Sequence, residues 1–495
     1  MNRSRDNLEI FPNRLASVCG LFGLLLPTLW ITPNASSQDL SKGSDIYATY
    51  CAQCHGPNLE GGQFSGFLDG MWNHGTYYAL QRNNIEFGII GTQMVAWGNV
   101  LSEVQIDTVL KFILEKEKEM GVEPPPPRDR SETEDYNLKV EVLAEGLKQP
   151  WGIEFLDERT ALFSEFSGRL RLMIDRKVIP EPITGTPSPA RQRSGQKPGF
   201  GFMDVALHPQ YADNGWIYLC YIHEASDIPP GKTEYPWSTR IVRGRIQNHA
   251  WIDQEVVYDP RPEDYTLIQD HFGSRMVFDD SGDLYFSIGD RGRKLDAQNL
   301  SRPEGKFHRI HDDGQPVGDN PYNSLERYGA LPTVYAYGTR NAQGLAIHPE
   351  TGEVWSAEHG PMGGDELNIV QAGANYGWPL ATKGLDRDGT VLTPYKSLPG
   401  IVDPIHYWTP SPAVCGIEFI DSPLFPAWKS NLLVAALKHQ YIYRLVLDGH
   451  KVVKEEVILR ESGRVRDIKT APDGSIYVLT DRRGMILHLT PENNE

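Results

Sequence analysis

Cysteine is scarce in this chain, with five residues among 495. A small domain held together by disulfides would carry many more, so a disulfide scaffold is excluded. Cys19 lies in an N-terminal apolar segment, and Cys51 and Cys54 belong to one short motif. The remaining pair, Cys220 and Cys415, lie far apart in the sequence. They could form a disulfide or both stay buried and free, and we expect the second arrangement.

Basic residues are also outnumbered, since 48 Lys and Arg face 65 Asp and Glu and the formal net charge is −17. An anionic surface is a poor match for phosphates, so nucleic acid is excluded as a partner. The hydrophobic content of 40% is ordinary for a globular protein with real cores. The length predicts more than one domain.

Long apolar runs are rare, and the one that stands out spans residues 15–31. Three arginines precede it and small residues follow it, which is the pattern of an export signal. We expect residues 1–37 to be a signal peptide that is cleaved near Ser37, which predicts a periplasmic or secreted protein. The alternative is an uncleaved anchor, because the run approaches membrane-spanning length. A membrane is a partner only in that case.

The sequence Cys51-Ala52-Gln53-Cys54-His55 is the attachment signature of a c-type haem. Both thiols can bond covalently to the haem edge, and His55 is then held beneath the iron as an axial ligand. The alternative is a zinc half-site, but no second CxxC or histidine pair supplies the missing zinc ligands. In known cytochromes of this kind the haem is attached outside the cytoplasm, which agrees with export.

Residues 38–118 are expected to form a small all-α haem domain, with Ser102 capping its last helix. The second iron ligand should be a methionine on a loop before that helix. Met94 lies 39 residues after His55, in a segment that resembles the methionine loop of class I cytochromes c. Met71 is the rival, but it lies too close to His55 in sequence to cross the haem easily.

Residues 119–136 are predicted to be a linker, because they are charged and contain four consecutive prolines at 124–127. Such a spacer is stiff and extended. It would keep two domains at a high effective concentration without fixing their pose.

Long helical patterns are absent beyond residue 137. A weak unit recurs there instead, with an apolar stretch, a polar turn and a second strand rich in aromatic and β-branched residues. Six repeats of short strands predict an all-β six-bladed β-propeller over residues 137–495, with a sandwich as the alternative. The chain is therefore expected to be multidomain, with an all-α domain before the propeller. The six copies begin at Trp151, Phe202, Arg275, Gly344, Gly416 and Arg466.

A first chemical cluster flanks one predicted hairpin of the propeller. His271 precedes the first strand and Asp290 follows the second, so an antiparallel pairing would bring them together. A carboxylate beside an imidazole fixes its tautomer and raises its basicity, as a general base requires. A structural histidine is the alternative.

A second cluster is cationic. Arg464 and Arg466 are two residues apart, and such residues share a face of a strand. With Arg340 and Lys438 they would form a positive site inside an acidic protein, which suits a small polyanionic ligand. Surface salt bridges are the alternative. Glycine-rich loops with carboxylates, near residues 358–366 and 375–378, suit calcium.

From about Trp151 to the C-terminus the chain resembles the soluble pyrroloquinoline quinone (PQQ) glucose and aldose sugar dehydrogenases. The resemblance covers roughly two-thirds of the chain. The matching segments include 149–152, 204–209, 288–292, 337–345, 358–361, 375–379, 437–438 and 464–467.

The resemblance implies roles for the first cluster. His271 matches the base that takes the proton of the sugar's anomeric hydroxyl, and Asp290 matches its orienting partner. Arg340 matches the group that stabilises charge on the quinone oxygen.

Cofactor and metal positions follow from the same resemblance. The positions that match PQQ contacts are Gln196, Asn341, Lys438, Arg464 and Arg466. The carbonyls of Gly360 and Pro361 match ligands of a calcium ion on PQQ, and Glu366 with the Tyr376 carbonyl matches a second, structural calcium. The run after Gln196 departs from the compact glycine-rich pattern of the family, which makes that assignment less secure than Arg340.

The expected function is that of a quinohaemoprotein oxidoreductase. It would oxidise the anomeric C–OH of an aldose, or a related alcohol, to a lactone by hydride transfer to PQQ. Electrons would pass to haem c and then to an external acceptor: a soluble cytochrome, a quinone or an oxidase. One alternative is a calcium-dependent propeller lactonase with an attached cytochrome, which would not need Lys438 with Arg464 and Arg466. Another is a propeller that only docks partners for a cytochrome carrier.

Overall fold

The structure is a computed structural model that describes residues 35–68, 72, 78–89, 92–122, 129–190, 201–227, 235–268, 270–386, 389–460, 462–481 and 483–492. Residues 1–34 of the predicted signal peptide, Met71, the prolines at 124–127 and Gln196 lie outside the described residues. None of the helices within the described ranges has the length and apolar character needed to cross a membrane.

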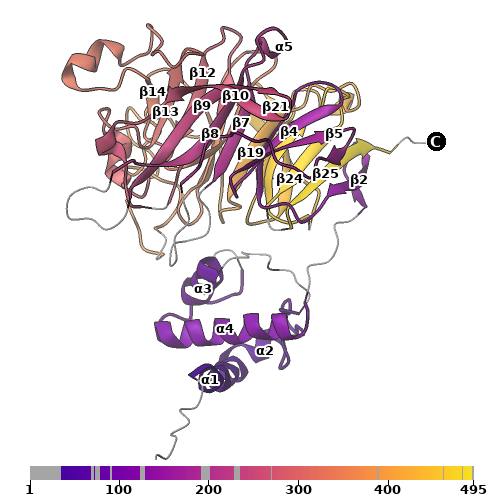
Figure 1. The fold of residues 1–495 in the computed structure, drawn as a ribbon. Helices are drawn as coiled ribbons and strands as arrows, with labels where there is room; N and C mark the ends of the chain where they lie inside the picture. The colour runs from indigo at the N-terminus through magenta and orange to yellow at the C-terminus, as the bar shows by residue number, and fades with distance from the viewer. Residues whose placement is uncertain are drawn as a thin grey trace, which may run out of the picture.

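The N-terminal part is helical, as predicted, and Figure 1 shows it on one side of a large β-structure. The Oγ of Ser102 accepts a hydrogen bond from the Gln105 backbone N–H at 3.4 Å, and Gln105 Oε1 accepts one from the Ser102 N–H at 2.9 Å. This capping box fixes the start of the last helix. A Cβ on Gly43 would lie 2.5 Å from the Phe112 Cβ, so glycine lets the first and last helices approach closely. The helices are α1 (Ala35–Tyr50), α2 (Ala52–His55), α3 (Tyr78–Phe87) and α4 (Glu103–Glu119).

The C-terminal part forms six antiparallel sheets, which confirms the predicted six-bladed β-propeller. Each of the six repeats predicted from the sequence supplies the first two strands of one blade. The first blade consists of β3 (Pro150–Phe155), β4 (Thr160–Glu165), β5 (Arg169–Ile174) and β6 (Lys177–Val178), and the second of β7 (Phe202–Leu207), β8 (Ile217–Glu224), β9 (Trp237–Gln247) and β10 (Ala250–Tyr258). The third consists of β11 (Met276–Phe278), β12 (Leu284–Ile288), β13 (Lys306–Ile310) and β14 (Val334–Tyr337), and the fourth of β15 (Ala342–Ile347), β16 (Val354–Glu358), β17 (Asp365–Ile369) and β18 (His406–Trp408). The fifth consists of β19 (Val414–Phe419), β20 (Leu432–Ala436), β21 (Tyr441–Asp448) and β22 (Lys451–Ile458).

The sixth blade closes the ring with both ends of the propeller. Its strands β23 (Val465–Thr470), β24 (Ile476–Thr480) and β25 (Met485–Pro491) come from the C-terminus, and β2 (Asn137–Ala144) comes from the N-terminal side. Strand β1 (Arg130–Glu132) already pairs with β2, so the sheet begins inside the segment predicted as linker. The acidic residues of this segment suggested a solvated linker, but Asp135 contacts a propeller cation instead. Its Oδ2 lies 2.9 Å from Arg444 Nη1.

The antiparallel order of the strands in each blade determines the end of the ring at which the predicted site residues lie. The inner strands β3, β7, β11, β15, β19 and β23 contact one another around the axis. In each antiparallel blade, the turn between the second and third strands opens at the same end of the ring as the connection to the next inner strand. We call this end the site end. Most of the predicted site residues of the described propeller lie in or beside these turns and connections: His271, Asp290, Arg340, Asn341, Gly360, Pro361, Glu366, Lys438, Arg464 and Arg466. Tyr376 lies in the long connection between β17 and β18, which reaches the same end because the Tyr376 N–H donates to the Tyr337 carbonyl at 2.9 Å.

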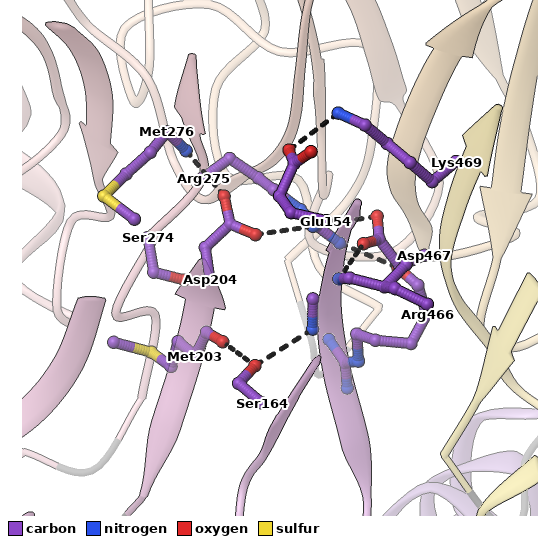
Figure 2. Close-up of polar contacts among 12 residues, drawn as sticks. Glu154, Ser164, Met203, Asp204, Ser274, Arg275, Met276, Arg466, Asp467 and Lys469 are labelled. Atoms are coloured by element: carbon purple, nitrogen blue, oxygen red, sulfur yellow. Dashed lines mark hydrogen bonds and ion pairs between the residues drawn. The ribbon is translucent and has the colours of Figure 1, made fainter. Parts of the chain in front are cut away.

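A buried polar network ties the inner strands together (Figure 2). Arg275 Nη1 lies 3.0 Å from Asp204 and 2.8 Å from Asp467, which belong to β7 and β23. On the same axis, Lys469 Nζ donates to Glu154 at 2.7 Å. Burial raises the pKa of Asp204 to about 7, although Arg275 opposes this shift. These contacts join four blades at the centre of the ring.

The two cysteines of the propeller are Cys220 and Cys415, on β8 and β19. Both are buried and free, which confirms the predicted arrangement. Desolvation raises the pKa of the Cys220 thiol well above its usual value, so this side chain acts as a small apolar group.

Candidate active site and haem site

His271 and Asp290 meet at the site end of the third blade. The β11–β12 hairpin returns the chain on itself, and His271 Nδ1 lies 2.5 Å from Asp290 Oδ1. His271 has a φ of +52°, a left-handed conformation that is uncommon for histidine. Such a conformation is held by its surroundings and is frequent at functional sites. The structure thus brings together the pair that the sequence predicted.

The carboxylate of Asp290 accepts two further hydrogen bonds. The Gly292 backbone N–H donates to Oδ1 at 2.8 Å, and Trp378 Nε1 donates to Oδ2 at 2.7 Å. Burial opposes ionisation of Asp290, but the bond from His271 and the charge of Arg340 outweigh it, so its pKa is lowered. Asp290 is therefore an ionised, fully oriented partner for the imidazole. The sequence did not reveal the role of Trp378, because Trp378 lies 88 residues after Asp290 and no sequence pattern links the two positions.

Arg340 lies beside this pair. Its Cζ is 5.5 Å from the centroid of the Trp378 ring, and its backbone carbonyl accepts from the Asp290 N–H at 2.7 Å. Its Nη1 donates to the carbonyls of His359 and Gly360, each at 2.9 Å. The predicted calcium-binding carbonyl of Gly360 and the predicted charge-stabilising guanidinium are therefore in direct contact.

Asp365, for which the sequence predicted no role of its own, holds the turn after β16. Asp365 Oδ1 accepts from the Gly360 N–H at 2.8 Å, and its Oδ2 accepts from the Val414 N–H at 3.0 Å. These bonds connect two adjacent blades. They position the Gly360 and Pro361 carbonyls at the site end.

Arg464 and Arg466 share one carboxylate, as their predicted common face requires. Asp481 Oδ2 lies 2.9 Å from Arg466 Nη2 and 3.4 Å from Arg464 Nε. Arg466 Nη1 also donates to Gln343 Oε1 at 3.2 Å, and its Cζ lies 5.5 Å from the Trp151 ring centroid. Two guanidinium groups are thus held together at the axis.

Lys438 and Asn341 complete the described part of this set. Burial lowers the pKa of Lys438, and Asp365 partly restores it. Asn341 Oδ1 accepts from the Gly273 N–H at 3.1 Å, so its side chain is directed toward the His271 loop. The pKa of His359 is well below its usual value because of burial and then the charges of Arg340 and Arg466.

Two buried carboxylates face each other across β16 and β17. Glu358 and Glu366 are register partners, and Ser356 pairs with Asn368 beside them. Burial raises the pKa of Glu366 to about 7, and burial with the charge of Glu366 raises the pKa of Glu358. Glu358 Oε2, Ser356 Oγ and Asn368 Oδ1 are buried without a hydrogen-bond partner.

This donor set fits a hard cation. Opposed buried carboxylates are costly unless a positive charge lies between them, and calcium prefers oxygen ligands. The described residues hold no group of three or more His, Cys, Asp or Glu side chains suited to a metal, so carbonyl and amide oxygens would have to complete the shell.

The helical part contains one cavity of about 530 Å³ lined by Cys51, Cys54, His55 and Met94. This volume lies in the range of about 300–1,000 Å³ that is usual for cofactor sites. His55 Nδ1 lies 2.8 Å from the carbonyl oxygen of Ser65. A proton on Nδ1 would donate to that carbonyl and leave Nε2 to bind iron, as metal-ligating histidines commonly do. The four predicted ligands therefore surround one space that fits haem.

Comparison with known proteins gives two family matches. A sequence model described as Glucose / Sorbosone dehydrogenase matches residues 147–488. A second model, described as Cytochrome C oxidase, cbb3-type, subunit III, matches residues 38–113.

Individual relatives agree with the larger match. The chain is 36% identical over 363 residues to Aldose sugar dehydrogenase YliI of Escherichia coli, which covers 72% of this chain and 94% of the relative. It is similar to the crystal structure of the soluble aldose sugar dehydrogenase from Escherichia coli in the apo-form, with TM-score 0.65 and 34% identity over 72% of this chain and all of the other. It shares its fold with the PQQ-bound form of an aldose sugar dehydrogenase from Streptomyces coelicolor, with TM-score 0.56, 24% identity and coverage of 74% and 100%.

Proposed function

The chain belongs to the glucose/sorbosone dehydrogenase family and carries an N-terminal cytochrome c domain, and we propose that it oxidises an aldose, or a related alcohol, at the anomeric C–OH to give a lactone. The acceptor would be PQQ, and the haem of the same chain would receive the electrons. The observation that carries the proposal is the His271–Asp290 pair beside Arg340 at the site end.

His271 is the proposed general base. Its Nδ1–H donates to the ionised Asp290, which leaves Nε2 as the lone pair that accepts the proton of the anomeric hydroxyl. Asp290 holds the ring in this tautomer and stabilises the imidazolium that forms. Trp378 prevents rotation of the carboxylate through its hydrogen bond to Oδ2.

Bound PQQ would supply a carbonyl carbon that takes up the hydride from the sugar. Arg340 is positioned to stabilise the negative charge that develops on the neighbouring oxygen, where water is excluded and electrostatic interactions are strong. Its contacts with two backbone carbonyls fix the guanidinium before the reaction begins.

The cationic residues would hold the carboxylates of this cofactor. Arg464 and Arg466 present a preorganised pair, since Asp481 already holds them together. Lys438, Asn341 and Gln196 are assigned to the same cofactor. The carbonyls of Gly360 and Pro361 would bind a calcium ion on it, and Glu366 with the Tyr376 carbonyl would bind a second calcium.

In the N-terminal domain, Cys51 and Cys54 would attach the haem, and His55 and Met94 would bind its iron. A thioether ligand raises the reduction potential, as an electron acceptor requires. Reoxidation would depend on an external one-electron acceptor. Attachment of such a haem and the predicted signal peptide support a periplasmic or secreted location.

The test is reconstitution of the full chain with PQQ and calcium, followed by a panel of aldoses with an artificial dye as acceptor. We expect dye reduction with at least one aldose, lactone as the product and no activity in His271→Ala. Lactone hydrolysis without dye reduction would instead identify a propeller lactonase. Unchanged function in His271→Ala would identify a docking module.

A further inference from the structure

A hydrogen bond between described residues joins the two domains. Gln440 Nε2 donates to the backbone carbonyl of Trp72 at 3.1 Å, across 368 residues of sequence. Gln440 belongs to the β20–β21 turn at the site end, yet it is only 8% exposed. Its φ of +57° is left-handed, a conformation that glutamine seldom adopts. A buried amide on a strained turn is therefore directed at the haem domain.

Trp72 lies between this turn and the haem cavity. It lines the cavity, and its indole Nε1 donates to Glu117 Oε1 of α4 at 2.6 Å. Its ring centroid lies 5.1 Å from that of Phe67, and Phe67 lies 4.6 Å from the His55 ring. Two aromatic contacts thus connect the interdomain hydrogen bond to the proposed iron ligand.

The other end of the connection is the quinone site. Lys438, a proposed cofactor ligand, lies two residues before Gln440 in the same turn. The Gln440 N–H donates to the Ala436 carbonyl at 3.1 Å and closes the turn, and the Lys438 N–H donates at 2.9 Å to the carbonyl of Pro412, which precedes β19. One four-residue turn therefore contacts the haem domain and carries a cofactor residue.

We propose that Gln440 and Trp72 form the docking contact through which electrons pass from the quinone site to the haem. This inference rests on the proposed function. Oxidation of one sugar hydroxyl releases two electrons and two protons. The haem iron is reduced from ferric to ferrous by one electron at a time, and an external one-electron acceptor reoxidises it after each transfer. The protons leave to solvent.

The test uses the full reconstituted chain and the variant Gln440→Gly, which removes the amide and also suits the left-handed backbone. Gln247→Ala is the matched control, because Gln247 is exposed at the end of β9, at the opposite end of the ring. In stopped-flow measurements with sugar, we expect haem reduction to slow at least tenfold in Gln440→Gly and to stay unchanged in Gln247→Ala. Dye reduction taken directly from the propeller should be unchanged in both.

The outcomes separate the two proposals. Absence of dye reduction in the wild-type chain would refute the proposed function. Normal dye reduction with an unchanged haem rate in Gln440→Gly would overturn only the docking contact.

A second readout needs neither PQQ nor sugar. Amide hydrogen exchange in the peptide that contains Trp72 should be faster in Gln440→Gly than in wild type, because the hydrogen bond from Gln440 to the Trp72 carbonyl is lost. Gln440 lies in the other domain, so a purely local effect of the substitution would not change exchange in this peptide. Equal exchange in the two proteins would also overturn the proposed contact.

Discussion

Replacing Asp290 by Asn tests the centre of the proposed mechanism with almost no change of shape. The carboxylate accepts hydrogen bonds from His271, Gly292 and Trp378. An amide has one acceptor oxygen and one donor group, so one of these donors must face an NH₂ group. The negative charge that stabilises protonated His271 is lost as well.

The size of the effect follows from these contacts. A buried donor without a partner costs about 1–3 kcal/mol, and loss of a charge-assisted hydrogen bond costs about 1.5–3 kcal/mol. If both act on the transition state, turnover falls by about 10²- to 10⁴-fold, at roughly 1.4 kcal/mol per factor of ten. A positioned general base accelerates a reaction by a similar factor, about 10²- to 10⁴-fold.

The assay is steady-state dye reduction by the reconstituted chain, with cofactor content measured on each sample. Trp378→Phe is the control, since it removes one hydrogen bond and keeps the charge, and we expect its turnover to fall less than that of Asp290→Asn. An Asp290→Asn protein that binds cofactor and keeps more than a third of wild-type turnover would refute the assigned role of the pair.

Three further predictions follow from the described contacts. The pKa of Asp290 is lowered in the folded protein, so ionised Asp290 stabilises the fold above the usual carboxyl pKa of about 3.9, and this stabilisation is lost as pH falls through the lower, folded-state pKa. The Tm of Asp290→Asn should therefore decrease less steeply than the Tm of wild type as pH falls below about 4. An equally steep decrease in both proteins would contradict this. Above pH 7, Glu358→Gln should raise the Tm of the calcium-free protein and reduce its rise on calcium addition, as read by thermal unfolding with and without a chelator. The reason is that burial and mutual repulsion oppose ionisation of Glu358 and Glu366 when no cation is bound. Met94→Ala should lower the haem reduction potential measured by spectroelectrochemistry, while an unchanged potential would exclude Met94 as the iron ligand.

The sequence predicted the inner half of each blade well. Second strands such as β8 and β20 are buried on both faces and therefore consist of nearly continuous apolar runs. The outer strands were not assigned, because strands such as β22 expose half of their residues and have no strong pattern. The start of the propeller was placed too late, since the acidic residues before β2 resemble a linker until their partner Arg444 is known.

The candidate site was predictable where local geometry creates it. His271 and Asp290 flank one hairpin, and strand periodicity alone places Arg464 beside Arg466. Asp481 follows the second strand of its blade much as Asp290 does, so the repeat itself could have indicated it. Trp378 could not be found in this way, because its contact with Asp290 depends on how a long loop crosses between blades.

Sugar oxidation at the propeller should reduce the haem of the same chain. This transfer is measured by the absorption spectrum of the reconstituted protein under anaerobic conditions, before and after addition of an aldose that reduces the dye. We expect the spectrum of ferrous haem in the wild-type protein and no change in His271→Ala. A haem that remains ferric while lactone accumulates would refute electron transfer between the two domains.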